Sequence, residues 1–170
     1  MESLHDWQNF YVMTGGAVAA LVGLMFIGVS LGSHLVNDEH TENIRTYVNP
    51  TLFHFVSVFV ISCIVLVPTH TTTSFAILIG LVSLVGLRQV TIVVKRMRKE
   101  TGNEADEANH WIWHGWLPYL SYGMGCAVTV GLISTGSSGW LNGLAVMVVT
   151  LVVCAIRNMW ILILWIASQH

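Results

Sequence analysis

The last apolar run of the chain carries a series of polar side chains at helical spacing. They recur at steps of four or eight residues: Asn142, Thr150, Cys154 and Asn158. Arg157 lies beside the end of the series. On a helix this spacing places the four residues roughly along one face. Polar groups at membrane depth face a bundle interior or a watery path. The stripe therefore indicates either the lining of a pore or a buried contact between helices.

Two further apolar runs contain polar residues that could also line such a pore. His54 has Thr51 three residues before it and Ser57 three residues after it, so the three share a helix face. Arg88 lies near the end of the third run. Rings of arginine favour anions, so a pore built from these residues would have a basic mouth. In the alternative interpretation His54 is a hydrogen-bonded core residue, and both arginines extend to the membrane surface.

Histidines suggest a second chemistry. Glu107, His110 and His114 are spaced three and four apart, so a helix would present one carboxylate and two imidazoles on one face. Glu-x-x-His spacing occurs in di-metal carboxylate bundles, and this ligand set suits zinc or iron. His34 or His54 from another helix would complete a metal site, and two histidines on different helices could hold a haem. The alternative is that these are interface histidines, since no second copy of the motif is present.

The composition places these residues in a membrane protein. Of the 170 residues, 54% are apolar and only 9% are charged, whereas soluble domains carry about 25% charged residues. Too few charges remain to cover a globule in water. The formal net charge of −2 gives no general attraction to nucleic acid.

Five apolar runs approach the length of about 20 residues that a spanning helix needs. They cover residues 10–35, 51–68, 74–94, 113–133 and 140–167. Backbone groups in lipid must be satisfied within each segment, which favours helices. We predict an all-α fold, a single-domain membrane bundle of about five transmembrane helices. Its three cysteines, Cys63, Cys126 and Cys154, are expected to be packing residues.

The basic residues predict the orientation. Four of them end the third run: Lys95, Arg96, Arg98 and Lys99. Cytoplasmic loops carry the excess of Lys and Arg, so this end is expected in the cytoplasm. Threading the chain from there puts Arg45 in a cytoplasmic loop, and Arg88 and Arg157 in the cytoplasmic halves of their spans. All seven basic residues then lie toward one side, with the N-terminus outside and the C-terminus in the cytoplasm.

The first run also carries a resemblance. It begins with Trp7-Gln8-Asn9-Phe10-Tyr11-Val12-Met13-Thr14-Gly15-Gly16-Ala17 and continues to Ser30. This stretch resembles the opening of small, uncharacterised multi-span inner-membrane proteins of bacteria. The resemblance implies a bacterial inner membrane and brings no activity, cofactor or site residue.

Three functions fit these patterns. The first is a homo-oligomeric channel or pore with a basic cytoplasmic mouth, neither an enzyme nor dependent on a cofactor. Gly15, Ala19 and Gly23 are spaced four apart and would let helices approach closely, within one chain or between chains. The second is a metal- or haem-binding membrane protein that uses the histidine cluster. The third is a non-catalytic modulator of a membrane complex, for which the sequence indicates no particular protein partner. The apolar runs contain no acidic residue, which argues against a cation filter.

Reporter fusions test the orientation. A reporter that is active only in the periplasm should be inactive at the C-terminus, because the basic loops retain that end in the cytoplasm. The same reporter inserted in the uncharged turn at residues 134–139 should be active. Periplasmic activity at the C-terminus would invert the topology.

Overall fold

The structure, a computed structural model, describes residues 7–33, 41–68, 70–100 and 112–167, and these residues form five long helices and one π-helical turn. The elements are α2 (Gln8–Ser33), α3 (Thr41–Leu66), α4 (Thr72–Glu100), η2 (Ile112–Trp116), α6 (Leu117–Thr135) and α7 (Trp140–Ala167). No strand occurs within these described ranges. The predicted all-α bundle is therefore confirmed.

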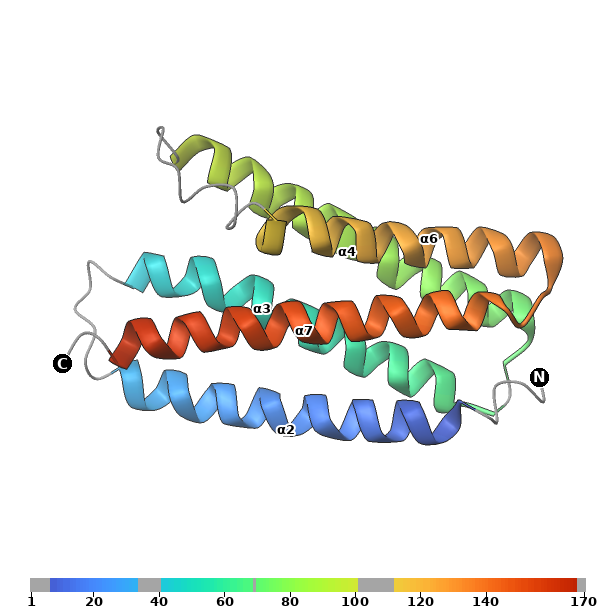
Figure 1. The fold of residues 1–170 in the computed structure, drawn as a ribbon, viewed down its shortest axis with the longest axis horizontal. Coiled ribbons are helices and arrows are strands. Elements are labelled where there is room, and N and C mark those ends of the chain that lie inside the picture. Colours follow the sequence, from blue (N-terminus) through green and yellow to red (C-terminus); the bar gives the residue numbers. More distant parts are fainter. Residues whose placement is uncertain (1–6, 34–40, 69, 101–111, 168–170) are drawn as a thin grey trace.

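The five helices run up and down along one long axis (Figure 1). Helices α2, α4 and α7 point one way, and α3 and α6 point the other, so α2 begins at the end of the bundle opposite to the one where α7 finishes. α3 contacts α2, α4 and α7, whereas α6 packs against α4 and α7. We call the end that holds the start of α3 and the last residues of α4 and α7 the basic end, because all the lysines and arginines of these helices lie toward it.

Four helices are long and apolar enough to cross a membrane, through Gln8–Ser30, Thr72–Arg96, Leu117–Thr135 and Trp140–Leu164. The apolar part of α3, Pro50–Leu66, is shorter. Its polar first turns extend it along the bundle, beside helices that run in the opposite direction. The chain is thus a multi-pass helical membrane protein, in which the central helix has the shortest apolar part.

One boundary differs from the sequence-based expectation. Arg45 was expected in a loop, but it lies in the second turn of α3, which begins at Thr41 and continues through Pro50. A proline inside a helix removes one backbone hydrogen bond and normally favours a helix start. Here the helix extends past Pro50, so the polar residues before it are helical too.

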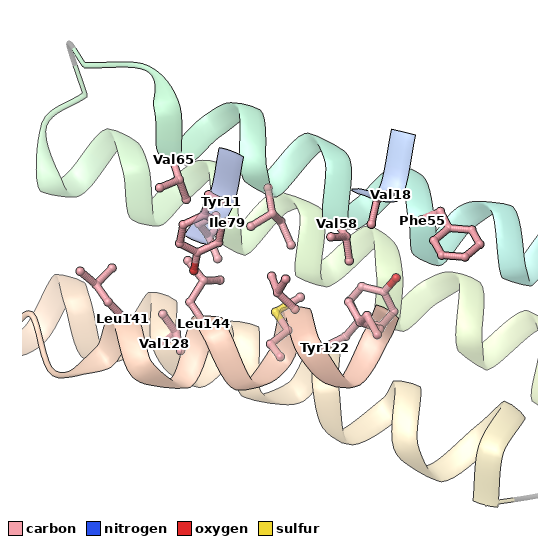
Figure 2. Close-up of a cluster of buried hydrophobic side chains, with 14 of the residues drawn as sticks. Tyr11, Val18, Phe55, Val58, Val65, Ile79, Tyr122, Val128, Leu141 and Leu144 are labelled. Atoms are coloured by element: carbon pink, nitrogen blue, oxygen red, sulfur yellow. The ribbon is translucent and has the colours of Figure 1, made fainter. Parts of the chain in front are cut away.

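Large apolar side chains cover the outside of the bundle as well as its core. Leu120 and Val130, for example, are both 66% exposed in the isolated chain. Contiguous apolar surface of this kind suits contact with lipid. Inside, residues from all five helices form one core, with Tyr11 of α2, Phe55 of α3 and Tyr122 of α6 among its largest members (Figure 2).

Glycine permits the close approach of α4 to α6. A Cβ atom on Gly86 of α4 would overlap the aromatic ring of Tyr122 of α6, which is fully buried. The ring cannot move aside without displacing its neighbours, because the core around it is close-packed. Gly86 therefore fixes how near Tyr122 lies to α4.

Replacing this glycine should destabilise the bundle. Gly86→Ala adds a methyl group where the ring of Tyr122 lies, and overpacking of this kind costs roughly 1–3 kcal/mol. Gly123→Ala on α6 is the matched control, because a Cβ there meets nothing within 4 Å. Thermal unfolding in detergent should show a lower Tm for Gly86→Ala alone. Equal Tm values for the two variants would contradict this packing.

Candidate functional site

A hydrogen-bonded group of polar side chains lies inside the bundle, between α3 and α6. The hydroxyl of Tyr122 donates to Ser57 Oγ at 3.1 Å and lies 3.0 Å from His54 Nδ1. Ser57 Oγ in turn donates to the carbonyl oxygen of Phe53 at 2.8 Å. Since Tyr122 gives its only proton to Ser57, the Nδ1 of His54 is the donor to Tyr122 in this arrangement.

These hydrogen bonds contribute to stability because their side chains are buried. His54 is 3% exposed, Ser57 is 4% exposed and Tyr122 is not exposed at all. The predicted face of His54 and Ser57, three residues apart on α3, does point into the bundle. The ring of Tyr122 also lies against Gly86 of α4 and near the ring of Phe53 of α3, with 6.3 Å between the two ring centroids. A buried tyrosine hydroxyl requires a partner, and here it has two.

Tyr122 was not singled out from the sequence. It lies well inside the predicted span 113–133, away from the interfaces where tyrosine usually anchors a membrane protein. This central position could have identified Tyr122 as a bonded residue, because the hydroxyl of a tyrosine deep in the membrane needs a hydrogen-bond partner on another helix. Which helix would supply the partner depends on the tertiary arrangement.

The polar stripe of α7 divides between surface and core. Asn142 is exposed and its Nδ2 donates to the Gly139 carbonyl at 3.2 Å, while the hydroxyl of Thr150 donates to the Val146 carbonyl at 2.8 Å. Cys154 and Asn158, in contrast, are buried. The reason is helical drift, since the sixteen residues from Asn142 to Asn158 turn the side chain by about 160° around the helix.

The basic-end part of α7 joins the group around Tyr122. Cys154 is fully buried on α7, which packs against both α3 and α6. Arg157 and Asn158 follow Cys154 by three and four residues, so all three lie toward one side of the helix. Together they extend the site toward the basic end. We call this set the buried polar site: His54, Ser57, Tyr122, Cys154, Arg157 and Asn158.

Arg157 is held by an aromatic ring. Its Cζ lies 4.5 Å from the centroid of the Trp113 ring, a cation–π contact. Trp113 belongs to η2, the π-helical turn before Pro118. Proline has no N–H, so it cannot bond the carbonyl four residues earlier, which favours a wider turn at this place.

Several atoms in this interior have no hydrogen-bond partner among the described residues. They are Nη1 of Arg157 and both polar side-chain atoms of Asn158, and, elsewhere in the core, the hydroxyls of Tyr11 and Ser62. Tyr11 and Ser62 belong to the α2–α3 contact, where Gly15 comes near Ser62. Buried polar groups without a protein partner usually bind water, an ion or a ligand.

The remaining predicted residues lie outside the buried polar site or outside the described part of the chain. Arg88 is exposed on α4. His34, Glu107 and His110 are not described, and neither is the side chain of His114. Within the described ranges no three His, Cys, Asp or Glu residues are grouped so as to hold a metal ion. The metal or haem site therefore stays a prediction.

Comparison with known proteins gives no relative. No family model, curated protein or solved structure matches the chain.

The hydroxyl of Tyr122 should contribute measurably to stability. Tyr122→Phe leaves a buried imidazole without one partner, which costs roughly 1–3 kcal/mol of unfolding free energy. Tyr119→Phe is the control on the same helix, because the Tyr119 hydroxyl makes only an exposed 3.3 Å contact with Thr91 and its loss should change stability by less than about 0.5 kcal/mol. Thermal unfolding followed by circular dichroism distinguishes the two. Equal stability losses would argue against the buried network.

Proposed function

We propose that the chain is a small channel that conducts anions across a membrane, along a path through the interior of its own helical bundle. The observation that supports this most directly is the half-buried guanidinium of Arg157, whose Nη1 has no partner among the described residues, in a bundle whose apolar segments contain no acidic residue. A positive charge that these segments do not neutralise attracts anions.

The energetics favour an anion at this place. A charged side chain at the bilayer centre costs roughly 2.5–3.5 kcal/mol. Arg157 lies between the middle and the basic end of α7, where stacking on Trp113 and access to the surface offset part of that cost. A mobile anion would offset more of it without a permanent ion pair, which is what conduction requires.

The path proposed differs from the one the sequence suggested. There, the stripe of α7 was expected to line the pore of a homo-oligomer. Cys154 and Asn158 instead face the interior of a single chain, with His54 and Ser57 of α3 in the same interior. We place the path within each subunit, between α3, α6 and α7. Tyr122, fully buried and bonded to α3, would close it in this conformation.

The cellular setting follows the sequence-based expectation. We place the protein in a bacterial inner membrane with its basic end, and so Arg157, in the cytoplasm. A homo-oligomer remains part of the proposal. Gly15 packs inside the chain against Ser62, but Ala19 and Gly23 of α2 are exposed and are available for contact with a second copy.

Ion flux into liposomes tests the channel and its path. Purified protein should admit chloride in preference to potassium, and Arg157→Ala should lower that preference about tenfold, as a change of ~1.4 kcal/mol would. Arg88→Ala removes the same charge from an exposed position and should leave the preference unchanged.

The outcomes separate three arrangements. A response to Arg88→Ala alone would move the path to the outside of the bundle, between subunits. Responses to both variants would indicate a general surface charge effect rather than a path beside Arg157. Wild-type protein that admits no ion under any gradient would overturn the channel.

A further inference from the structure

Two neighbouring residues of α7 hold three polar atoms without partners among the described residues. They are Nη1 of Arg157 and both Nδ2 and Oδ1 of Asn158, whose side chain is only 2% exposed. Several buried serine hydroxyls use their own helix, as Ser83 does with the Ile79 carbonyl at 2.8 Å. An asparagine amide buried with neither its donor nor its acceptor used indicates a bound species.

The three atoms lie in one region of the bundle. Arg157 and Asn158 are adjacent in the helix, and both lie within one turn of Cys154. The ring of Trp113 lies against the guanidinium, with 4.5 Å between Cζ of Arg157 and the ring centroid. Adjacent side chains project about 100° apart around a helix, but the long side chain of Arg157 can bring its positive charge to a species bound at Asn158.

The unpaired atoms define the chemistry of that species. Nη1 and Nδ2 are donors and require acceptors, whereas Oδ1 is an acceptor and requires a donor. The positive charge of Arg157 requires a negative charge, for which its planar fork suits oxyanions. A single small ligand that meets all three needs has anionic oxygens and also a hydroxyl group.

We propose that Arg157 and Asn158 bind an oxyanion that keeps a hydroxyl, of the hydrogen phosphate or hydrogen carbonate class. Anionic oxygens accept from Nη1 and Nδ2, and the hydroxyl donates to Oδ1. Chloride and sulfate carry no hydroxyl at neutral pH and would leave Oδ1 unpaired. The site rests on the proposed anion path, because it names the class of anion that the path selects.

The same chemistry has two sources. Inorganic phosphate would enter as a free solute, while the terminal phosphate of phosphatidic acid would enter from the membrane with its lipid. Both keep a hydroxyl on phosphorus. Phosphatidylglycerol, a phosphodiester, has none and serves as the lipid control.

Calorimetric titration of the detergent-purified protein tests binding. Sodium phosphate should bind saturably with one site per chain and raise the Tm, because a ligand that binds only the folded state stabilises it. Sulfate at the same ionic strength should bind at least about tenfold more weakly, which corresponds to the loss of one hydrogen bond. Equal responses to phosphate, sulfate and chloride would overturn the proposal.

Two variants assign the binding to these residues. Asn158→Leu should abolish phosphate binding, while its Tm without phosphate should be unchanged or higher, because an apolar side chain of similar size replaces an unpaired amide. Asn142→Leu, at the exposed asparagine of the same helix, should bind phosphate normally. If Asn158→Leu fails to fold, Arg157→Met serves instead, because Arg157 is only half-buried. This variant must also lose phosphate binding in the titration. Phosphate affinity that survives in both variants would overturn the site.

Two further measurements identify the source of the ligand and test the site independently of the channel. Displacement of phosphate by vesicles with phosphatidic acid, but not by vesicles with phosphatidylglycerol, supports the site with a lipid as its ligand. No displacement by either lipid supports a free oxyanion. Phosphate binding without flux of either phosphate or chloride would overturn the channel and leave the site, and anion flux without selective phosphate binding would overturn the site and leave the channel.

Discussion

The side chain of Tyr122 links α6 to two other helices of this bundle. Its hydroxyl group joins α6 to α3 through His54 and Ser57. Its ring touches α4 at Gly86. In a membrane, apolar side chains gain little by leaving lipid for one another, so polar contacts and close packing determine how helices associate. Both kinds of contact are concentrated on this one residue.

The charge at the basic end follows a different constraint. A guanidinium cannot be neutralised by losing its proton, so the bundle must accommodate the charge of Arg157 with an aromatic ring, with water or with an anion. The ring is provided by Trp113, which the widened turn before Pro118 carries. Arg157 thus has a cation–π contact but no acidic residue in the apolar segments to neutralise its charge, which favours an anion at this place.

Much of the fold was readable from the sequence, because apolar length and the one-sided distribution of lysine and arginine act on each segment separately. The helical bundle and the inward face of His54 and Ser57 are local properties of this kind. The helical start of α3 before Pro50 was missed, since a proline there reads as a boundary. Spacing predicts that the α7 stripe drifts around its helix. The point where the stripe passes from surface to core, and the helix that the hydroxyl of Tyr122 meets, depend on how each helix is rotated against its neighbours.

The order of synthesis gives the position of α7 a further meaning. This helix packs against both α3 and α6, yet it follows both of them along the chain. Residues of α3 and α6 alone bring His54, Ser57 and Tyr122 together, but Arg157 and Asn158 reach them only once α7 has been synthesised. During biogenesis the contact between α3 and α6 can therefore form first, and the proposed anion path would gain its positive charge only when α7 packs against both helices.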